Sequence, residues 1–235
     1  MAAVASGKTA QIVYYFGSEG RQNLTEVLLV IRKTLRKRQD LQSLKLVIFT
    51  AEGQGPALAF NRLREFKTEM IAVTFPIHFS VPLPDGKGRY FPKISEDIRQ
   101  FFDGVRIKVL VPPRLPFDVI DGMDGHNQQV ELIRKTIAMF GSGFALCVQA
   151  VLHACDVGAV QEDEAVIAMS GDTAALIIAS TTAHFLNRAN GLQIQEIFCK
   201  PRTLTISRRR PMPAGAAPAL EAEGRVLEGE VSPQP

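Results

Sequence analysis

The stretch "VIAMSGDTAALIIAST", residues 166–181, decides the fold class more than any other part of the sequence. Two apolar runs flank the tetrapeptide Ser170, Gly171, Asp172 and Thr173. Short apolar runs on either side of a Gly-Asp pair are typical of buried strands joined by a tight turn. We therefore expect an antiparallel hairpin, and the pattern alone favours a bare turn over a ligand-binding loop at its corner.

Upstream of this hairpin, segments with strand character alternate with segments of helical periodicity. We expect strands at residues 10–16, 44–50, 70–77, 105–113 and 192–200. We expect helices at residues 23–39, 55–66, 95–104, 127–143 and 144–160. Asn23 followed by Glu26 resembles a capping box at the start of the first helix. The alternation predicts a three-layer αβα fold, with a mainly parallel sheet and an antiparallel edge hairpin.

The composition of three segments sets the expected domain boundaries. We expect a single α/β domain over residues 10–205, after a flexible N-terminus at residues 1–9. Residues 206–235 become rich in Pro, Ala and Glu, which predicts a disordered tail. Within the domain, residues 78–93 are rich in Pro and Gly and are predicted to form a long loop.

Charge and cysteine content exclude several classes of protein. A net charge of +3 on 235 residues is too small to predict nucleic-acid binding without a localised basic patch. The three cysteines and four histidines show no metal-ligand spacing, so we expect neither a disulfide framework nor a metal site. The apolar run at residues 139–160 contains Gln149, His153 and Asp156, which favours a buried helix over a membrane span. These features together predict a cytoplasmic protein.

The first candidate binding residues lie where a predicted strand runs into "TAEGQG" and a helix follows. Ligands of open α/β sheets bind at the carboxyl ends of strands, beside helix N-termini that favour anions. Gly53 and Gly55 would let the backbone approach a phosphate, with Thr50 and Gln54 beside them. Glu52 opposes a phosphate unless its side chain points away. A plain strand-to-helix turn that uses glycine for geometry alone explains the pattern about equally well.

Two further candidates follow the next predicted strand. Thr74 lies near its end, and His78 lies at the start of the predicted long loop, where an imidazole could face a ligand. Catalysis by His78 would need a carboxylate or hydroxyl partner that the sequence does not place beside it.

Five pieces of the sequence occur in an order known from one family. They are "NLTEVL" at 23–28, "FTAEGQGPA" at 49–57, "DVGAV" at 156–160, "GDTAALII" at 171–178 and "EIFCKPR" at 196–202. In this order the chain resembles the C-terminal α/β domain of pyruvate kinase, in the stand-alone form of small, largely uncharacterised prokaryotic proteins. The resemblance spans residues 11–203, and its last two pieces are the most specific.

The resemblance implies a binding domain rather than a kinase, because it covers none of the catalytic barrel of pyruvate kinase. In the full enzyme, the loop that matches residues 50–55 grips one phosphate of a sugar-bisphosphate effector. The loop that matches residues 170–173 closes over that effector. In the relatives this second loop is longer and Gly-rich, whereas here it is trimmed to a few residues.

These considerations predict a phosphorylated small molecule as ligand, either an effector, a nucleotide or a flavin. The resemblance suggests flavin mononucleotide (FMN) as a cofactor. One alternative is a flavin-dependent enzyme, which requires His78, Asp172 or Thr74 to converge on the phosphate loop. The other is a non-catalytic assembly module, a homo-oligomer in which the predicted strand at 192–200 pairs across an interface.

Overall fold

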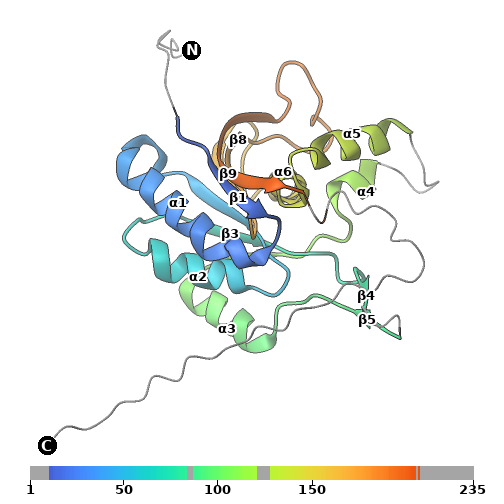
Figure 1. The fold of residues 1–235 in the computed structure, drawn as a ribbon, viewed down its shortest axis with the longest axis horizontal. Coiled ribbons are helices and arrows are strands. Elements are labelled where there is room, and N and C mark those ends of the chain that lie inside the picture. The colour runs from blue at the N-terminus through green and yellow to red at the C-terminus, as the bar shows by residue number, and fades with distance from the viewer. Residues whose placement is uncertain (1–10, 84–86, 121–127, 205, 207–235) are drawn as a thin grey trace, which may run out of the picture.

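A seven-stranded sheet forms the centre of the protein, and helices cover both of its faces (Figure 1). The computed structural model describes residues 11–83, 87–120, 128–204 and 206. The strands of the central sheet are β1 (Tyr14–Ser18), β2 (Lys45–Phe49), β3 (Met70–Val73), β6 (Lys108–Leu110), β7 (Ala165–Met169), β8 (Ala174–Ile178) and β9 (Gln193–Thr203). Their order across the sheet is β1-β9-β8-β7-β2-β3-β6.

Most neighbouring strands run parallel, and β8 alone runs antiparallel to both of its neighbours. The pairs β1–β9, β7–β2, β2–β3 and β3–β6 are parallel, whereas β7–β8 and β8–β9 are antiparallel. The predicted α/β class, the mainly parallel sheet and the antiparallel hairpin at residues 166–181 are therefore confirmed. The predicted flexible N-terminus, residues 1–9, lies outside the described residues, and so does the predicted disordered tail, residues 206–235, except for Ile206.

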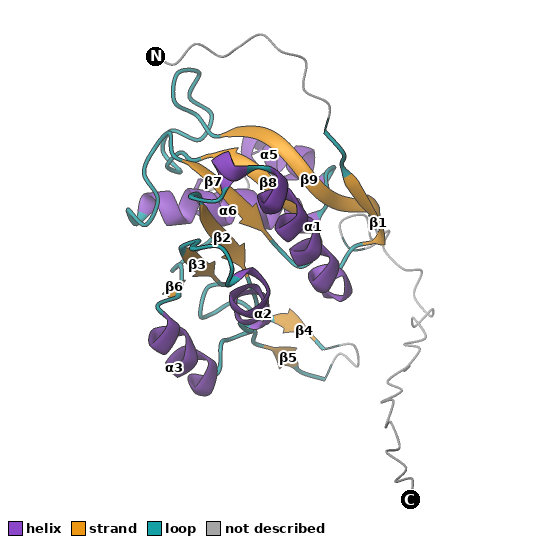
Figure 2. Cartoon of the chain, turned by 90° about the vertical axis from the view of Figure 1, so that its left-hand side faces the viewer, coloured by secondary structure: helices purple, strands orange, loops and turns teal. Residues whose placement is uncertain are grey.

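The helices form two layers, one on each face of the sheet (Figure 2). One layer contains α1 (Leu24–Lys37), α2 (Gln54–Leu63) and α3 (Glu96–Val105). The other contains α4 (Pro116–Ile120), α5 (Gln128–Ala138) and α6 (Ser142–Asp156). Alternate residues of β2 point to opposite layers, so Leu46 and Ile48 join the first core while Val47 and Phe49 join the second. Burial on both faces explains why this strand reads as a continuous apolar run.

Helix α6 is the most deeply buried helix, because it packs directly on β2, β7 and β8. Of the described helices, none is by itself long and apolar enough to cross a membrane. Helices α5 and α6 reach that length and apolar composition when they are taken together, and the chain bends by 120° between them.

Three local predictions differ from the structure. Asn23 forms no side-chain cap on α1, and its amide instead donates to the carbonyl oxygens of Ser18 and Gly20, closing a 3-10 turn at Arg21–Asn23. The predicted long loop contains a small antiparallel pair, β4 (Val81–Pro82) and β5 (Arg89–Tyr90). The predicted connector after β6 contains α4, whose five residues are too few to display a helical period.

Candidate functional site

A cavity of about 550 Å³ lies at the carboxyl edge of the parallel strands. Its walls come from the segments that follow β1, β2, β3 and β7, together with the first turns of α2 and α6. This is the edge at which open α/β sheets bind ligands, because chain reversals and helix N-termini gather there. The volume is within the range typical of small-molecule sites, about 300–1,000 Å³.

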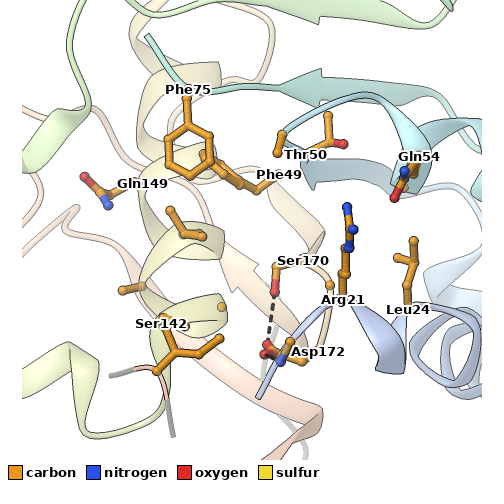
Figure 3. Close-up of a pocket in the computed structure, with 18 of the residues that line it drawn as sticks. Arg21, Leu24, Phe49, Thr50, Gln54, Phe75, Ser142, Gln149, Ser170 and Asp172 are labelled. Atoms are coloured by element: carbon orange, nitrogen blue, oxygen red, sulfur yellow. Dashed lines mark hydrogen bonds between the residues drawn. The ribbon is translucent and has the colours of Figure 1, made fainter. Parts of the chain in front are cut away.

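One side of the cavity is suited to an anion. Gln54 and Gly55 form the first turn of α2, and the leading N–H groups of a helix have no intrahelical acceptor. The Gly53 N–H donates to the buried Thr50 hydroxyl oxygen at 2.9 Å, which fixes the turn before the helix. Figure 3 shows the Arg21 side chain extending from the far wall toward Thr50 and Gln54. The guanidinium of Arg21 and the N–H groups in the first turn of α2 thus face the same part of the cavity.

Glu52 lies in this loop, but its carboxylate is engaged by other groups. One oxygen accepts a hydrogen bond from the Tyr90 hydroxyl of β5, and the other lies 3.5 Å from Arg21 Nη1. Burial and the hydrogen bond to Glu52 raise the pKa of Tyr90 to about 12. The negative charge of Glu52 is therefore balanced at the cavity mouth by Arg21, and the loop is tied to the β4–β5 pair.

Aromatic side chains form the middle of the cavity. The rings of Phe49 and Phe75 meet edge to face, with 4.8 Å between their centroids. Phe117 also lines the cavity and is almost fully buried. Such walls suit a flat apolar body, because aromatic rings prefer stacked or edge-to-face neighbours.

A buried carboxylate lies on another wall, at the corner of the β7–β8 hairpin. Asp172 Oδ2 accepts the Gly20 N–H at 2.7 Å, and Oδ1 accepts the Thr173 hydroxyl at 2.9 Å (Figure 3 shows the further contact to Ser170). Burial raises the pKa of Asp172, the bond from Gly20 opposes that rise, and the nearby Glu19 carboxylate adds to it. This wall is therefore less suited to an anion than the Arg21 side.

The N-terminus of α6 is already occupied by protein carboxylates. Glu19 is buried, and its Oε1 accepts hydrogen bonds from the Ser142 N–H at 2.8 Å and the Ser142 hydroxyl at 3.0 Å. Its other oxygen accepts the Ile206 N–H at 2.5 Å. Because Glu19 takes these donors, the first turn of α6 is less available to an anion than the first turn of α2, which lies beside Arg21.

The glycine in the hairpin corner is needed for space rather than for an unusual backbone angle. The Ser170 N–H donates to the Thr173 carbonyl oxygen at 2.9 Å, which closes the turn. Neither Gly171 nor Asp172 has a positive φ angle. A Cβ atom on Gly171 would lie 3.1 Å from the Cα of Arg21, so glycine lets the two loops approach.

The structure brings together six of the ten predicted site residues. Those that line the cavity are Thr50, Gln54, Gly55, Ser170, Gly171 and Asp172. The remaining four, Gly53, Thr74, His78 and Thr173, are not in its lining. A Cβ atom on Gly53 would lie 2.7 Å from Ile98 Cγ2, on the side of α3. The Thr74 side chain is buried, and its hydroxyl donates to the Phe75 carbonyl oxygen, whereas His78 is exposed.

Four cavity residues with functional side chains were not predicted as site residues from the sequence: Arg21, Arg134, Ser142 and Gln149. Arg21 lies in a 3-10 turn with no motif around it, and Arg134 lies in α5, within the helix expected at residues 127–143. Gln149 was noted only as a group that opposes a membrane span. The available signal was an uncharged polar residue inside a mostly apolar helix, since buried polar groups need partners.

The described residues do not form a cluster of metal-binding side chains. No group of three or more His, Cys, Asp or Glu side chains is placed to hold a metal ion in the described part of the chain. All three cysteines are free and buried.

A search against protein-family models finds no family that matches this sequence.

Proposed function

We propose that the protein binds a phosphorylated small molecule in this cavity, with the phosphate at Arg21 and the first turn of α2. The observation that carries the proposal is the convergence of Arg21, Gln54 and Gly55 on one side of a cavity whose body is aromatic. A helix N-terminus and a guanidinium both favour phosphate, and the guanidinium can donate two parallel hydrogen bonds to it. The mainly parallel αβα architecture supports a further proposal, that the domain is of the pyruvate kinase C-terminal type.

The proposed test compares phosphorylated ligands with their dephosphorylated forms. The probes are FMN with riboflavin, AMP with adenosine, and ribose 5-phosphate, in thermal unfolding and calorimetric titration. A ligand at a hundred times its Kd stabilises the folded state by about 2.7 kcal/mol. We expect phosphorylated members to bind more tightly, and Arg21→Gln to remove about 1 kcal/mol, or fivefold in affinity, for those members only.

Arg32→Gln is the matched control, because Arg32 is paired with Glu65 on the outer surface of α1 and does not line the cavity. The proposal fails if no phosphorylated probe binds, or if riboflavin and adenosine bind as tightly as FMN and AMP. It also fails if Arg32→Gln and Arg21→Gln weaken binding equally. A substitution at Gly53 would not serve, since its φ of +91° and its contact with Ile98 make it structural.

Asp172 supports a second candidate, a flavin-dependent enzyme. Its carboxylate lines the same cavity as Thr50 and Gln54, whereas Thr74 and His78 do not. A carboxylate with a raised pKa is suited to proton transfer. Purified protein that is yellow from bound flavin would favour this candidate, and colourless protein that does not take up added FMN would oppose it.

The sheet also has a feature that favours assembly into a homo-oligomer. Strand β9 lies between β8 and β1, but the register with β1 begins only at Cys199, so residues 193–198 pair with β8 alone. Ile12 and Ile194 are exposed, at 69% and 43%. An unpaired strand edge with apolar side chains is a common contact between subunits. Native mass spectrometry would report a dimer, and Ile194→Lys should then reduce it.

A further inference from the structure

Gln149 is a buried polar side chain in a helix that is otherwise built for the core. It lies in the middle of α6, is only 7% exposed, and contributes to the cavity wall. Its neighbours Val148 and Ala150 are fully buried apolar residues. An apolar side chain of similar size would satisfy the packing, so the amide calls for a separate explanation.

The orientation of the Gln149 amide is set by the backbone of α4. The Phe117 N–H donates to Gln149 Oε1 at 3.3 Å, and a backbone N–H can only be paired with the oxygen end of the amide. The Nε2 group, which carries two N–H donors, therefore points away from the Phe117 N–H. In the described part of the structure, no hydrogen bond involves this Nε2 atom. The cavity is where a partner for it can be placed.

Aromatic rings line the same cavity as Gln149. Figure 3 shows the rings of Phe75 and Phe49 between Gln149 and Gln54, with Gln149 nearer to Phe75. The amide donor is thus separated from the proposed phosphate side by the aromatic middle of the cavity. A ligand that spans the cavity would place a flat group between the rings and a hydrogen-bond acceptor at Gln149.

We propose that the ligand is a phosphorylated compound with a flat heteroaromatic ring that carries a carbonyl acceptor, and that Gln149 Nε2 donates to that acceptor. This inference rests on the proposed function and narrows its ligand class. Pyrimidine, oxopurine and flavin rings have such an acceptor edge, whereas a sugar phosphate has neither a flat ring nor this edge. A site that hydrogen-bonds a ligand discriminates strongly against analogues without the matching group, because its own buried polar group is then left unpaired.

The test measures the binding of FMN, UMP and ribose 5-phosphate to the wild type and two variants by calorimetric titration. Gln149→Leu keeps the volume and removes the donor. Gln149→Glu keeps an oxygen for the Phe117 N–H but places an acceptor where Nε2 was. We expect at least one ring phosphate to bind the wild type more tightly than ribose 5-phosphate does. Both variants should weaken that ring ligand about tenfold to a hundredfold, since an unmatched buried polar group costs about 1–3 kcal/mol.

Ribose 5-phosphate should be unaffected by both variants, and Gln161→Leu, the same change at an exposed position outside the cavity, should leave all affinities unchanged. The inference is overturned if ribose 5-phosphate binds as tightly as the ring compounds. It is also overturned if Gln149→Leu keeps full affinity for them while its unfolding midpoint shows that it is folded.

The inference and the proposed function fail in different ways. Riboflavin and uridine lack the phosphate but keep the ring acceptor, so their binding should respond to Gln149→Leu and not to Arg21→Gln. If they bind as tightly as their phosphates and respond to Gln149→Leu, the phosphate proposal is wrong and the ring inference stands. If Arg21→Gln weakens every phosphate while Gln149→Leu weakens nothing, the reverse holds.

Discussion

The carboxylate of Asp172 occupies the space that a side chain at position 143 would need. A Cβ atom built on Gly143 would lie 1.9 Å from Asp172 Oδ1 and 2.5 Å from the Ser170 hydroxyl oxygen. The β7–β8 hairpin corner therefore sits directly against the first turn of α6. This contact joins two walls of the cavity, and it is possible because the residue at position 143 is a glycine, which has no Cβ atom.

Gly143→Ala should destabilise the protein for this reason. The new Cβ would push Asp172 away from Gly20 and Thr173, and we expect a loss of about 2–4 kcal/mol in the free energy of unfolding from overpacking and broken hydrogen bonds. The matched control is Gly104→Ala, also in a helix, where an added Cβ meets nothing within 4 Å. It should stabilise the protein by about 0.5–1 kcal/mol. Urea unfolding of both variants tests the pair, and equal effects would contradict the contact.

Asp172→Asn should change how stability depends on pH. Burial raises the folded-state pKa of Asp172, so the unfolded chain ionises first as the pH rises above the ordinary value of 3.8. The wild type therefore loses stability through the window between the unfolded and folded pKa, by at most about 1.4 kcal/mol per pH unit. The Asp172→Asn variant has no carboxyl group at this position, so it lacks this pH-dependent loss of stability.

The measured quantity is the free energy of unfolding of the wild type minus that of Asp172→Asn, from urea titrations at several pH values from about 4 to about 7. This difference should fall as the pH rises and then level off. A difference that rises with pH would mean that the hydrogen bonds from Gly20 and Thr173 outweigh burial and lower the pKa instead.

Glu52→Gln should strengthen the binding of a phosphorylated ligand. The substitution removes a negative charge from the cavity mouth and leaves Arg21 available to the phosphate. We expect a threefold to tenfold gain in affinity at low salt that shrinks as salt is added, which corresponds to roughly 1 kcal/mol. Glu65→Gln is the control, because Glu65 also pairs with arginines, Arg32 and Arg36, but lies outside the cavity. Equal gains in both variants would point to net charge rather than to Arg21.

The three cysteines should be unreactive in the folded protein. Burial raises the pKa of Cys155 to about 11 and that of Cys199 to about 12, and it raises the pKa of Cys147 as well. The thiolate is the reactive form, so a thiol reagent at neutral pH should modify none of them until the protein unfolds. Mass spectrometry after labelling with and without urea tests this, and rapid labelling of any one cysteine in the native protein would contradict its burial.

The central strands could be predicted because burial on both faces leaves an unbroken apolar run. This holds for β2, β3, β7 and β8. Edge strands gave a weaker signal: β1 was expected at residues 10–16 but runs from Tyr14 to Ser18, and most of its side chains are exposed or half-buried. The β4–β5 pair has two residues in each strand, which is too short for any periodicity.

The site was only partly predictable, for a different reason. Residues that directly follow strands, such as Thr50 and Asp172, can be placed at the carboxyl edge from the strand pattern alone. Arg21 cannot, because it reaches the cavity through contacts between distant parts of the chain. Gln149 stands out as a polar residue in an apolar run, but the sequence does not place it at this cavity. Gly20 and Asp172, for example, are hydrogen-bonded across 152 positions. No local pattern carries information of that range.

The pairing of β1 with β9 sets an order of events during synthesis. Among the described strands, the first strand pairs only with the last one, with Tyr14 opposite Cys199 and Ser18 opposite Thr203. During synthesis, β1 cannot take its place in the sheet until β9 has also been made, because domains generally fold as units. A chain that ends before residue 199 would therefore contain every described helix but would lack the strand that pairs with β1, which leads into Gly20 and Arg21 of the cavity lining.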